Sequence, residues 1–270
     1  MTQPMDSSMT FWQHLDALRS VIIRMALTIT VAGVVMFIAM PWIFDHIILW
    51  PCRDDFPLCR LFDMSAVTGE PAGTPFSVSL ININLGSQLM VQMSTSMHLA
   101  LVVTFPVLIA MLWSFVSPGL YPREKRHARR AFLFATTMFY LGVATAYIMV
   151  FPITLRFLSQ YQLSELITNT ITLDSYIDNF MTITLIMGIV FELPMLAWLL
   201  GKIGILDRSF FSRYRRHAIV ILLVLAALIT PTGDPFSLFV VFAPLYLLWE
   251  LSAYLVPAAT KSDSKAPVTE

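Results

Sequence analysis

Residues 180–200 read FMTITLIMGIVFELPMLAWLL, and Glu192 is the only ionisable side chain among them. A helix of about 20 apolar residues crosses the hydrocarbon core of a bilayer, which is about 30 Å thick. Insertion scales give an acid at the centre of such a helix a cost of about 2.5–3.5 kcal/mol. Glu192 therefore indicates either a functional polar contact or a carboxyl group that satisfies the backbone freed by Pro194. The stretch predicts a transmembrane helix that contains an acid.

The rest of the chain has the same apolar character. Of its 270 residues, 57% are hydrophobic and 13% are charged, and the mean hydropathy is +0.73, whereas a soluble domain has about 25% charged residues. We therefore expect an all-α, polytopic membrane protein with six transmembrane helices. Their expected ranges are Val21–Met40, Gln88–Val116, Ala131–Phe151, Phe180–Leu200, Ala218–Ile229 and Phe236–Val256.

Helix length and proline positions shape the expected bundle. The prolines inside or beside spans, Pro106, Pro194 and Pro244, predict kinked helices. The fifth span is short, because its twelve residues reach only about 18 Å at about 1.5 Å per residue. The uninterrupted apolar stretch of the sixth, Leu238–Trp249, is equally short. Short fifth and sixth spans suggest a locally thinned bilayer.

The connections follow from these spans. Residues 1–260 are expected to form one transmembrane domain, and the polar residues 261–270 a disordered cytoplasmic tail. In the second external loop, apolar residues at roughly helical spacing over Ile153–Leu166 predict an interfacial helix. The expected external loops are 41–87 and 152–178, and the expected cytoplasmic loops are 117–130 and 201–217.

The basic residues set the expected orientation, because Lys and Arg concentrate in cytoplasmic connections. All but three of the 17 Lys and Arg residues lie on one side, around the start of the first span, in 117–130, in 201–217 and in the tail. The three exceptions, Arg53, Arg60 and Arg156, share the other side with several acids. We therefore expect a multi-pass protein of the cytoplasmic (inner) membrane with both termini in the cytoplasm.

Motifs for catalysis and cofactor binding are missing from the sequence. It contains no G-x-x-x-x-G-K-[ST], no H-E-x-x-H and no G-x-S-x-G, and its five histidines are scattered singly. We expect no enzyme, no metal site and no cofactor. A net charge of zero argues against nucleic acid as a partner. Cys52 and Cys59 lie in the first external loop, where a disulfide and two free thiols both remain open.

Three further acids are candidates for function. Glu250 lies toward the cytoplasmic end of the sixth span, where a functional role and simple snorkelling are equally open. Asp234 lies in the turn TPTGDP at 230–235, which fits ordinary turn chemistry. Glu124 is the only acid of loop 117–130, which begins with the stiff stretch SPGLYP. It either neutralises neighbouring arginines or offers a carboxylate to a basic ligand, since a guanidinium binds a carboxylate through two hydrogen bonds.

Several motifs resemble, in order, those of the TatC family, the receptor subunit of the twin-arginine protein translocase. HLDALR at 14–19 is similar to the family's H-L-x-E-L-R. WSFVSPGLY at 113–121, followed by Glu124, resembles its W-x-F-x-x-P-x-L-Y-x-x-E. FYLG at 139–142 with Tyr147 and FP at 151–152 resembles its third span, and FELP at 191–194 its fourth. Thr230-Pro231 with Asp234 and Ser237 resembles the turn before its sixth span, so the resemblance covers nearly the whole chain.

The resemblance implies a concave six-helix scaffold that binds twin-arginine signal peptides at its cytoplasmic face. It also implies recruitment of small single-span partners of the TatA and TatB type, self-association, and export of folded proteins driven by the proton-motive force. The implied signal site consists of Glu124 with His14, Leu18 and Arg19. Glu192 is the implied acid of the concave face, and Thr230 a contact for the partner's helix. Further sensitive positions are Pro51, Phe115, Tyr147 and Asp234.

One departure affects the implied signal site. The family motif has Glu where this chain has Ala17. Asp16 is adjacent, but one residue turns a helix by about 100° and the Asp side chain is shorter. A second departure lies just after the turn before the sixth span, where Leu238 occupies a position at which Gln is common in the family.

A function of another class also fits the intramembrane acids. A proton-coupled secondary transporter relays protons through such groups, here Glu192 and Glu250. That interpretation predicts substrate-coupled uptake by this chain alone, whereas a translocase receptor needs its small partners.

Overall fold

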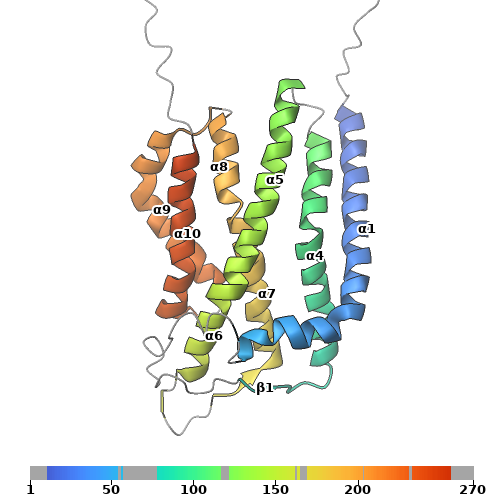
Figure 1. The fold of residues 1–270 in the computed structure, drawn as a ribbon, viewed down its shortest axis with the longest axis vertical. Helices are drawn as coiled ribbons and strands as arrows, with labels where there is room; N and C mark the ends of the chain where they lie inside the picture. Colours follow the sequence, from blue (N-terminus) through green and yellow to red (C-terminus); the bar gives the residue numbers. More distant parts are fainter. Residues whose placement is uncertain are drawn as a thin grey trace, which may run out of the picture. The chain divides into compact units, whose positions relative to one another are not determined.

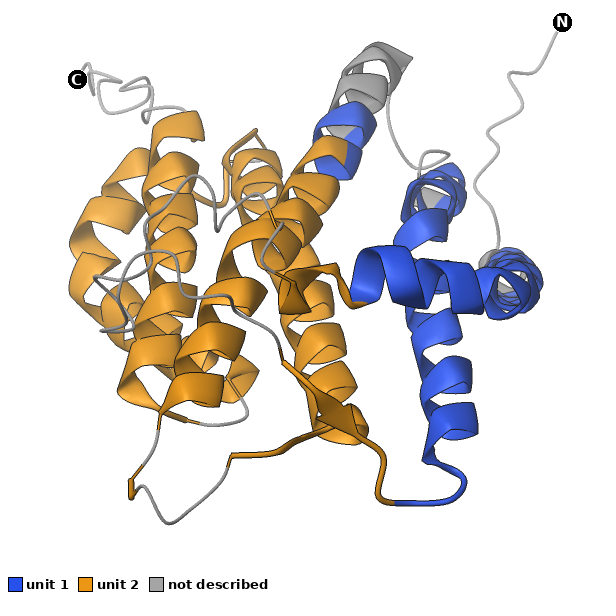
Figure 2. Ribbon diagram, turned by 60° about the horizontal axis from the view of Figure 1, so that its bottom comes forward, with its two compact units in different colours: residues 1–48, 84–136 blue, residues 49–83, 137–270 orange. Residues whose placement is uncertain are grey.

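A computed structural model describes residues 11–53, 56, 78–116, 122–161, 163–164, 169–202, 204–230 and 233–256, with the side chains at 11–14, 116 and 122–131 outside that description. By contacts the chain forms two compact units (Figure 2). Unit 1 comprises residues 1–48 and 84–136, and unit 2 comprises residues 49–83 and 137–270. In its described part the chain is helical apart from two very short strands, as expected for an all-α membrane protein.

Unit 1 is built on an antiparallel pair of long helices, α1 (Phe11–Ile43) and α4 (Ser87–Val116) (Figure 1). The amide of Gln92 donates to the carbonyl of Phe37 at 3.1 Å and so joins the two helices. After α1 the chain continues as a π-helical turn, η1 (Phe44–Ile48). The unit also includes the first part of α5 (Pro122–Thr145), so α5 belongs to both units.

Unit 2 contains the remaining elements and most of the described core. Its strands β1 (Leu80–Ile81) and β2 (Ile171–Thr172) pair in parallel. Helix α10 packs on α6, α8 and α9, and α7 packs on η4 and α6. The remaining bounds are η2 (Trp50–Cys52), η4 (Ala146–Val150), α6 (Phe151–Gln160), α7 (Leu173–Val190), α8 (Leu193–Lys202), α9 (Arg208–Ile229) and α10 (Pro235–Leu255).

In unit 2, α5 and α7 approach each other closely, and glycine makes the contact possible. A Cβ atom on Gly142 would lie 2.6 Å from the carbonyl oxygen of Met187 and 2.8 Å from the Cβ of Phe191. From the other side, a Cβ on Gly188 would lie 2.8 Å from the ring of Phe139. Small residues allow helix backbones to approach closely where no water drives association. Gly142 and Gly188 therefore fix how tightly these two helices pack.

Five helical segments in the described part of the chain are long and apolar enough to cross a membrane: Leu15–Cys52, Ser87–Phe115, Phe132–Gln160, Leu173–Lys202 and Pro235–Leu255. The second agrees with the expected span within a residue or so. The fourth is two helices, because α7 ends at Val190 and α8 begins at Leu193. The expected interruption at Pro194 is therefore present, whereas α4 and α10 run through Pro106 and Pro244 without ending.

The helix of the third span continues into residues that were expected to belong to the external loop 152–178 and to a separate interfacial helix. A π-helical turn, η4, precedes α6, so the third span continues through Pro152 to Gln160. Proline has no N–H group to donate to the carbonyl four residues back. A single π turn is the form in which π-helical hydrogen bonding usually occurs within an α-helix. The helical spacing interpreted as interfacial belongs to core packing, because Phe151, Thr154 and Leu155 are buried. At the far end, α7 already begins at Leu173.

The expected cytoplasmic loops are also shorter than predicted. Helix α5 begins at Pro122, so most of 117–130 is helical. Proline favours the first position of a helix, and Arg, Lys, Glu and Ala are strong helix formers. Within 201–217, α9 begins at Arg208 because the carboxylate of Asp207 accepts from the backbone N–H of Phe210 at 2.8 Å and from the Ser209 hydroxyl. These hydrogen bonds hold the pKa of Asp207 below its ordinary value.

The expected short fifth and sixth spans are found only in part. Helix α10 has 21 residues, which reach about 31 Å, so the sixth helix is not short. Helix α9 has 22 residues, but its first turns carry arginines and its uncharged part begins at Ala218. First-loop residues from 57 to 77 and the tail lie outside the described residues.

The α5–α7 contact generates a prediction about stability. Gly142→Ala should lower the free energy of unfolding by about 1–3 kcal/mol, because the added methyl meets backbone that cannot move aside easily. Thermal unfolding of the purified protein in detergent measures the change.

Gly33→Ala is the matched control in α1. A Cβ there meets Met97 Sδ only at 3.6 Å, an ordinary contact, and alanine is the better helix former by up to about 1 kcal/mol. Gly33→Ala should therefore be neutral or stabilising. An equal loss in both variants would show that tight packing at Gly142 is not the cause.

Candidate functional site

The residues of the expected signal site lie in unit 1. The start of α1 carries Asp16 and Arg19, which are exposed, and Leu18, which is half-buried. Glu124 is the third residue of α5. Figure 1 shows the start of α1, the end of α4 and the start of α5 at the same end of this unit. The side chains of His14 and Glu124 lie outside the described ones, so the structure brings the two segments to one end without giving their contacts.

Glu192 lies at the break between α7 and α8. The N–H of Phe191 still donates four residues back, to Met187, but the N–H of Glu192 donates only three residues back, to Ile189, at 3.0 Å. Pro194 has no N–H to continue the ladder, and the helix resumes when Leu196 donates to the Glu192 carbonyl at 3.0 Å. The break therefore follows from Pro194 and places an acid at its centre.

The carboxyl group of Glu192 is half-buried, and its Oε1 atom is buried without a hydrogen-bond partner. Leaving such an oxygen unsatisfied costs about 1–3 kcal/mol. The carboxyl therefore does not satisfy the backbone freed by Pro194, which was one of the two interpretations. It remains available to a donor from another molecule.

Glu250 differs from Glu192 in having a counter-ion, although its Oε1 atom is likewise buried without a hydrogen-bond partner. Its Oε2 accepts from Arg215 Nη2 at 2.7 Å, which joins α10 to α9. A carboxylate with a fixed counter-ion is poorly suited to relay protons. No hydrogen bond between Glu192 and Glu250 is present in the described part of the chain. The geometry therefore gives the transporter interpretation no connection between its two acids.

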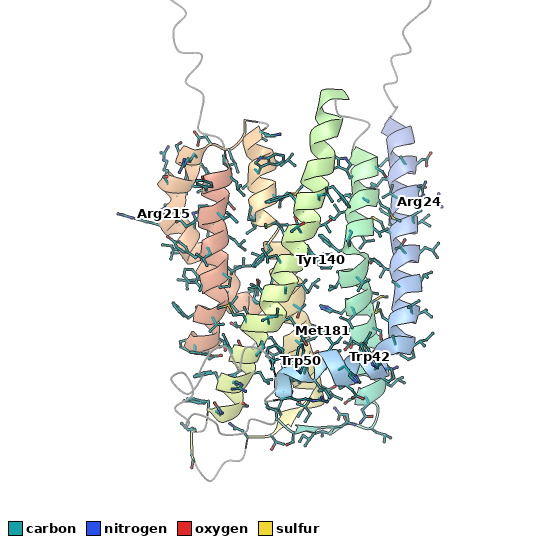
Figure 3. The ribbon with its side chains drawn as sticks, in the orientation of Figure 1. Arg24, Trp42, Trp50, Tyr140, Met181 and Arg215 are labelled. Carbon is teal, nitrogen blue, oxygen red and sulfur yellow. The ribbon has the colours of Figure 1, made fainter. Side chains whose placement is uncertain are left out.

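Tyr147 belongs to an aromatic cluster in unit 2, and Pro51 follows Trp50 of that cluster in the sequence. Pro51 is buried in the short helix η2, next to Trp50 (Figure 3). The ring of Phe56 contacts Trp50 at 5.2 Å and Tyr147 at 5.9 Å, both edge to face. Tyr147 also contacts Phe180 of α7 at 6.2 Å. Edge-to-face aromatic pairs are favourable, so Tyr147 holds Phe56 of the first loop against the helices.

Cys52 belongs to the same region and carries a free, buried thiol. The Tyr176 hydroxyl donates to its sulfur. The structure therefore has a thiol at Cys52 where one of the two open alternatives was a disulfide, and Cys59 lies outside the described residues.

The turn between α9 and α10 is held from within the chain. Asp234 caps α10 by accepting from the N–H of Ser237 at 2.7 Å, which is the ordinary turn chemistry considered from the sequence. Thr230 is 2% exposed, and its hydroxyl donates to the carbonyl of Ala226 at 3.0 Å. In this chain by itself Thr230 is not at the surface, so its contact with a partner helix remains a prediction.

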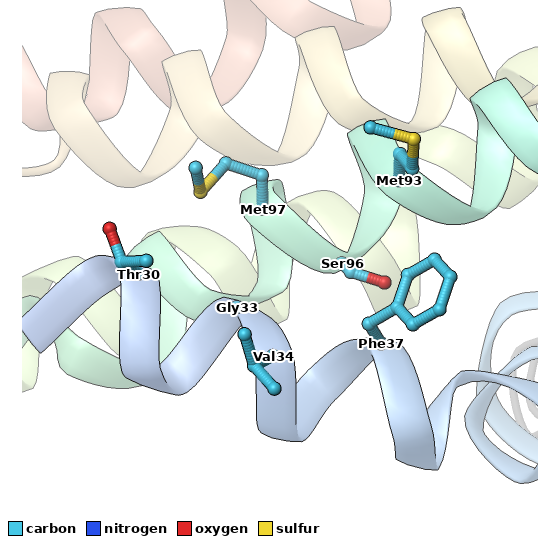
Figure 4. A pocket seen from close by; sticks show the side chains of 7 residues that line it. All are labelled: Thr30, Gly33, Val34, Phe37, Met93, Ser96 and Met97. Carbon is cyan, nitrogen blue, oxygen red and sulfur yellow. The ribbon is translucent and has the colours of Figure 1, made fainter.

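Phe115 and a surface groove belong to unit 1. Phe115 is half-buried near the end of α4. The groove lies farther along α1 and α4 and has a volume of about 350 Å³ (Figure 4). Its lining is Thr30, Gly33, Val34, Phe37, Met93, Ser96 and Met97. Apolar grooves on membrane helices are filled by acyl chains without any specific ligand, and this one contains no acid or base.

Sequence reasoning missed two features of the site. It counted Arg215 only as a loop charge, although the residue is the counter-ion of Glu250. A signal was present, because Asp207 followed by good helix formers predicts a helix start. It also quoted Gly142 without seeing that this residue seats Phe191 next to Glu192. In the described part of the chain, no group of three or more His, Cys, Asp and Glu side chains is placed to hold a metal ion.

Comparisons with known proteins agree with this geometry. The family model described as "Sec-independent protein translocase protein (TatC)" matches residues 13–244. The TatC protein of Blattabacterium sp. subsp. Periplaneta americana (strain BPLAN) is 30% identical over 92% of this chain and 95% of its own length. That of Carboxydothermus hydrogenoformans is 29% identical over 93% of each. A crystal structure of the twin arginine translocase receptor TatC in DDM has a TM-score of 0.73 and 27% identity, covering 90% of this chain and 99% of its own. The chain therefore belongs to the TatC family of Sec-independent protein translocase proteins.

Proposed function

We propose that this chain is the receptor subunit of a twin-arginine translocase. It binds the twin-arginine signals of folded precursors at its cytoplasmic face, recruits small single-span subunits, and uses the proton-motive force for export. A TatC protein is a translocase component and not an enzyme. The solved relative is called a twin arginine translocase receptor, and the absence of catalytic motifs from the sequence is consistent with a binding role.

The observation that carries this proposal is the position of Glu124. It is the third residue of α5, and the start of α5 shares one end of unit 1 with the start of α1, where HLDALR lies. A guanidinium pairs with a carboxylate through two parallel hydrogen bonds, which selects arginine over lysine. A signal with two arginines therefore fits an acid at this position, with Asp16, Leu18 and Arg19 at the same end of unit 1.

The orientation follows from charge. Arg19 and the basic start of α5 lie at the same end of unit 1, and the basic start of α9 supplies the corresponding excess in unit 2. The positive-inside rule assigns such ends to the cytoplasm. With six crossings, both termini are then cytoplasmic, which places Glu124 where precursors arrive.

A second contact is proposed at Glu192, for a donor on the signal or on a partner's helix. Its Oε1 atom is buried without a partner in this chain. In a bilayer, polar groups between helices stabilise association because lipid offers no alternative hydrogen bond. The unsatisfied oxygen therefore favours assembly of the translocase at this point over the isolated chain.

Replacing Glu124 tests the signal site. Glu124→Gln should weaken crosslinking of an Arg-Arg signal peptide about ten- to a hundredfold, because it removes a hydrogen bond between charged groups. Crosslinking yields are measured on the purified full-length protein in lipid. Asp16→Asn should have a smaller effect, since Asp16 lies on α1 and is shorter.

The matched control is Asp178→Asn, which removes an exposed carboxylate from α7 in unit 2 and should leave capture unchanged. A Lys-Lys signal should already bind weakly to the unmodified protein. Equal capture of Arg-Arg and Lys-Lys signals, or an Asp16 effect larger than that of Glu124, would contradict the site as proposed.

Replacing Glu192 separates stability from function. Glu192→Leu should leave thermal stability unchanged or raise it, because the buried oxygen without a partner is removed. Export should fall by about tenfold or more, since the contact with the incoming segment is lost, while signal capture at Glu124 persists. Unfolding in detergent and export by cells that depend on this chain give the two readouts. Unchanged export would exclude the proposed contact.

A further inference from the structure

Helix α9 has an outer face that the functions above do not use. Its buried residues, among them Phe211, Ala218 and Leu222, face the rest of unit 2. The opposite side is exposed along its whole length. This outer face consists of Phe210, Arg213, Tyr214, Arg216, His217, Val220, Ile221, Val224 and Leu228.

The outer face changes character along the helix. Beyond His217 it is aliphatic, and Val220, Ile221, Val224 and Leu228 are 60–76% exposed. Their exposure fits contact with acyl chains, since they occur at the three- and four-residue spacing that keeps residues on one side of a helix. The beginning of the face is instead basic and aromatic. Arg213 and Arg216 lie about 6–10 Å along the axis from Val220 at about 1.5 Å per residue, which is headgroup depth.

The aromatic side chains at this end form a row. Phe210 and Tyr214 have ring centroids 4.7 Å apart, and Tyr214 and His217 are 5.8 Å apart. The guanidinium of Arg213 lies 5.9 Å from the centre of the Tyr214 ring. Aromatic rings that are amphipathic concentrate at the boundary between hydrocarbon and headgroups, and such a ring also orients a guanidinium above it. The row therefore places Arg213 at that boundary.

The nearby acids do not neutralise these two arginines. Asp207 caps the helix and is bound by Ser209 and the N–H of Phe210. Glu250 is paired with Arg215, on the side of α9 that faces α10. Neither Arg213 nor Arg216 has an ion pair with any acid in the described part of the chain. The two guanidiniums lie three residues apart on one face and have no acidic partner there. Their positive charge therefore favours binding of an anion at headgroup depth.

We propose that Arg213 and Arg216 bind the phosphate of an anionic phospholipid, with its acyl chains along Val220, Val224 and Leu228. A twin-arginine signal is excluded as the partner, because its charge has the same sign. A lipid is favoured over an acidic protein segment because the basic end continues directly into the exposed aliphatic side chains. Basic residues near an anionic membrane surface each contribute about fivefold in affinity. The site does not include Glu124. The lipid-binding experiment can therefore fail while signal capture succeeds, and the reverse is also possible.

Native mass spectrometry of the purified full-length protein tests this site with dioleoyl phosphatidylglycerol and dioleoyl phosphatidylcholine. The unmodified protein should prefer phosphatidylglycerol. Arg213→Gln/Arg216→Gln should weaken its binding about twentyfold, as expected for two arginines, with phosphatidylcholine binding unchanged. Arg213→Lys/Arg216→Lys keeps both charges and should keep most of the preference, which guards against a variant that fails to fold.

The matched control is Arg208→Gln/Arg215→Gln, which removes two charges from the same turns of α9 but from the side of Tyr254 and Glu250 on α10. It should change phosphatidylglycerol binding less than twofold. Equal loss in both double variants would show general attraction only, and no preference in the unmodified protein would refute the site. Displacement of the lipid by millimolar glycerol phosphate would assign a free-phosphate site, and displacement by an acidic peptide would assign a protein partner.

Discussion

The contact between α5 and α7 constrains the geometry around Glu192 in unit 2. Gly142 brings the α5 backbone onto Met187 and Phe191, and Gly188 makes room for Phe139 from the other side. Neither position has space for a methyl group. The packing at these two glycines therefore fixes the distance between α5 and α7. Phe191 is the last residue bonded in the regular pattern of α7 and the neighbour of Glu192. The packing that joins the helices thus also fixes where the helix break begins.

Four acids in the described part of the chain, Asp207, Asp234, Glu250 and Glu192, differ in how their surroundings hold the carboxylate. Asp207 and Asp234 cap helices, where backbone N–H groups satisfy the carboxylate. Glu250 has an arginine as counter-ion on its Oε2 atom, although its Oε1 atom is also buried without a hydrogen-bond partner. Glu192 has an oxygen with no partner in this chain. Capped and paired acids contribute to the fold, whereas an acid left unsatisfied in an apolar span is costly unless a second molecule completes it.

Hydropathy located the apolar part of each span well but not the ends of the helices. The second span was placed almost to the residue, because Ser87–Val116 begins and ends where its apolar run does. Helices α5 and α9 start between two and three turns before the expected spans, since Arg and Lys stay helical outside the hydrocarbon. Pro152 was interpreted as a boundary, but a π turn carries the helix past it. The motifs identified the family and Glu192, but neither the Arg215–Glu250 pair nor the Gly142 contact has a short-range signature, because both depend on residues about 35 to 50 positions apart.

Local rules of helix formation are broken at Glu192 and followed almost everywhere near it, which is typical of functional sites. Pro194 removes a backbone donor, the ladder shortens at Glu192, and a carboxyl oxygen is buried without a partner. An energetically unfavourable local conformation of this kind persists only when the packing around it holds it in place. Here the glycine contact on one side and the packing of α8 on α10 on the other supply that constraint. The proposed contact at Glu192 would therefore need little remodelling of the site, so more of the interaction energy would be expressed as affinity.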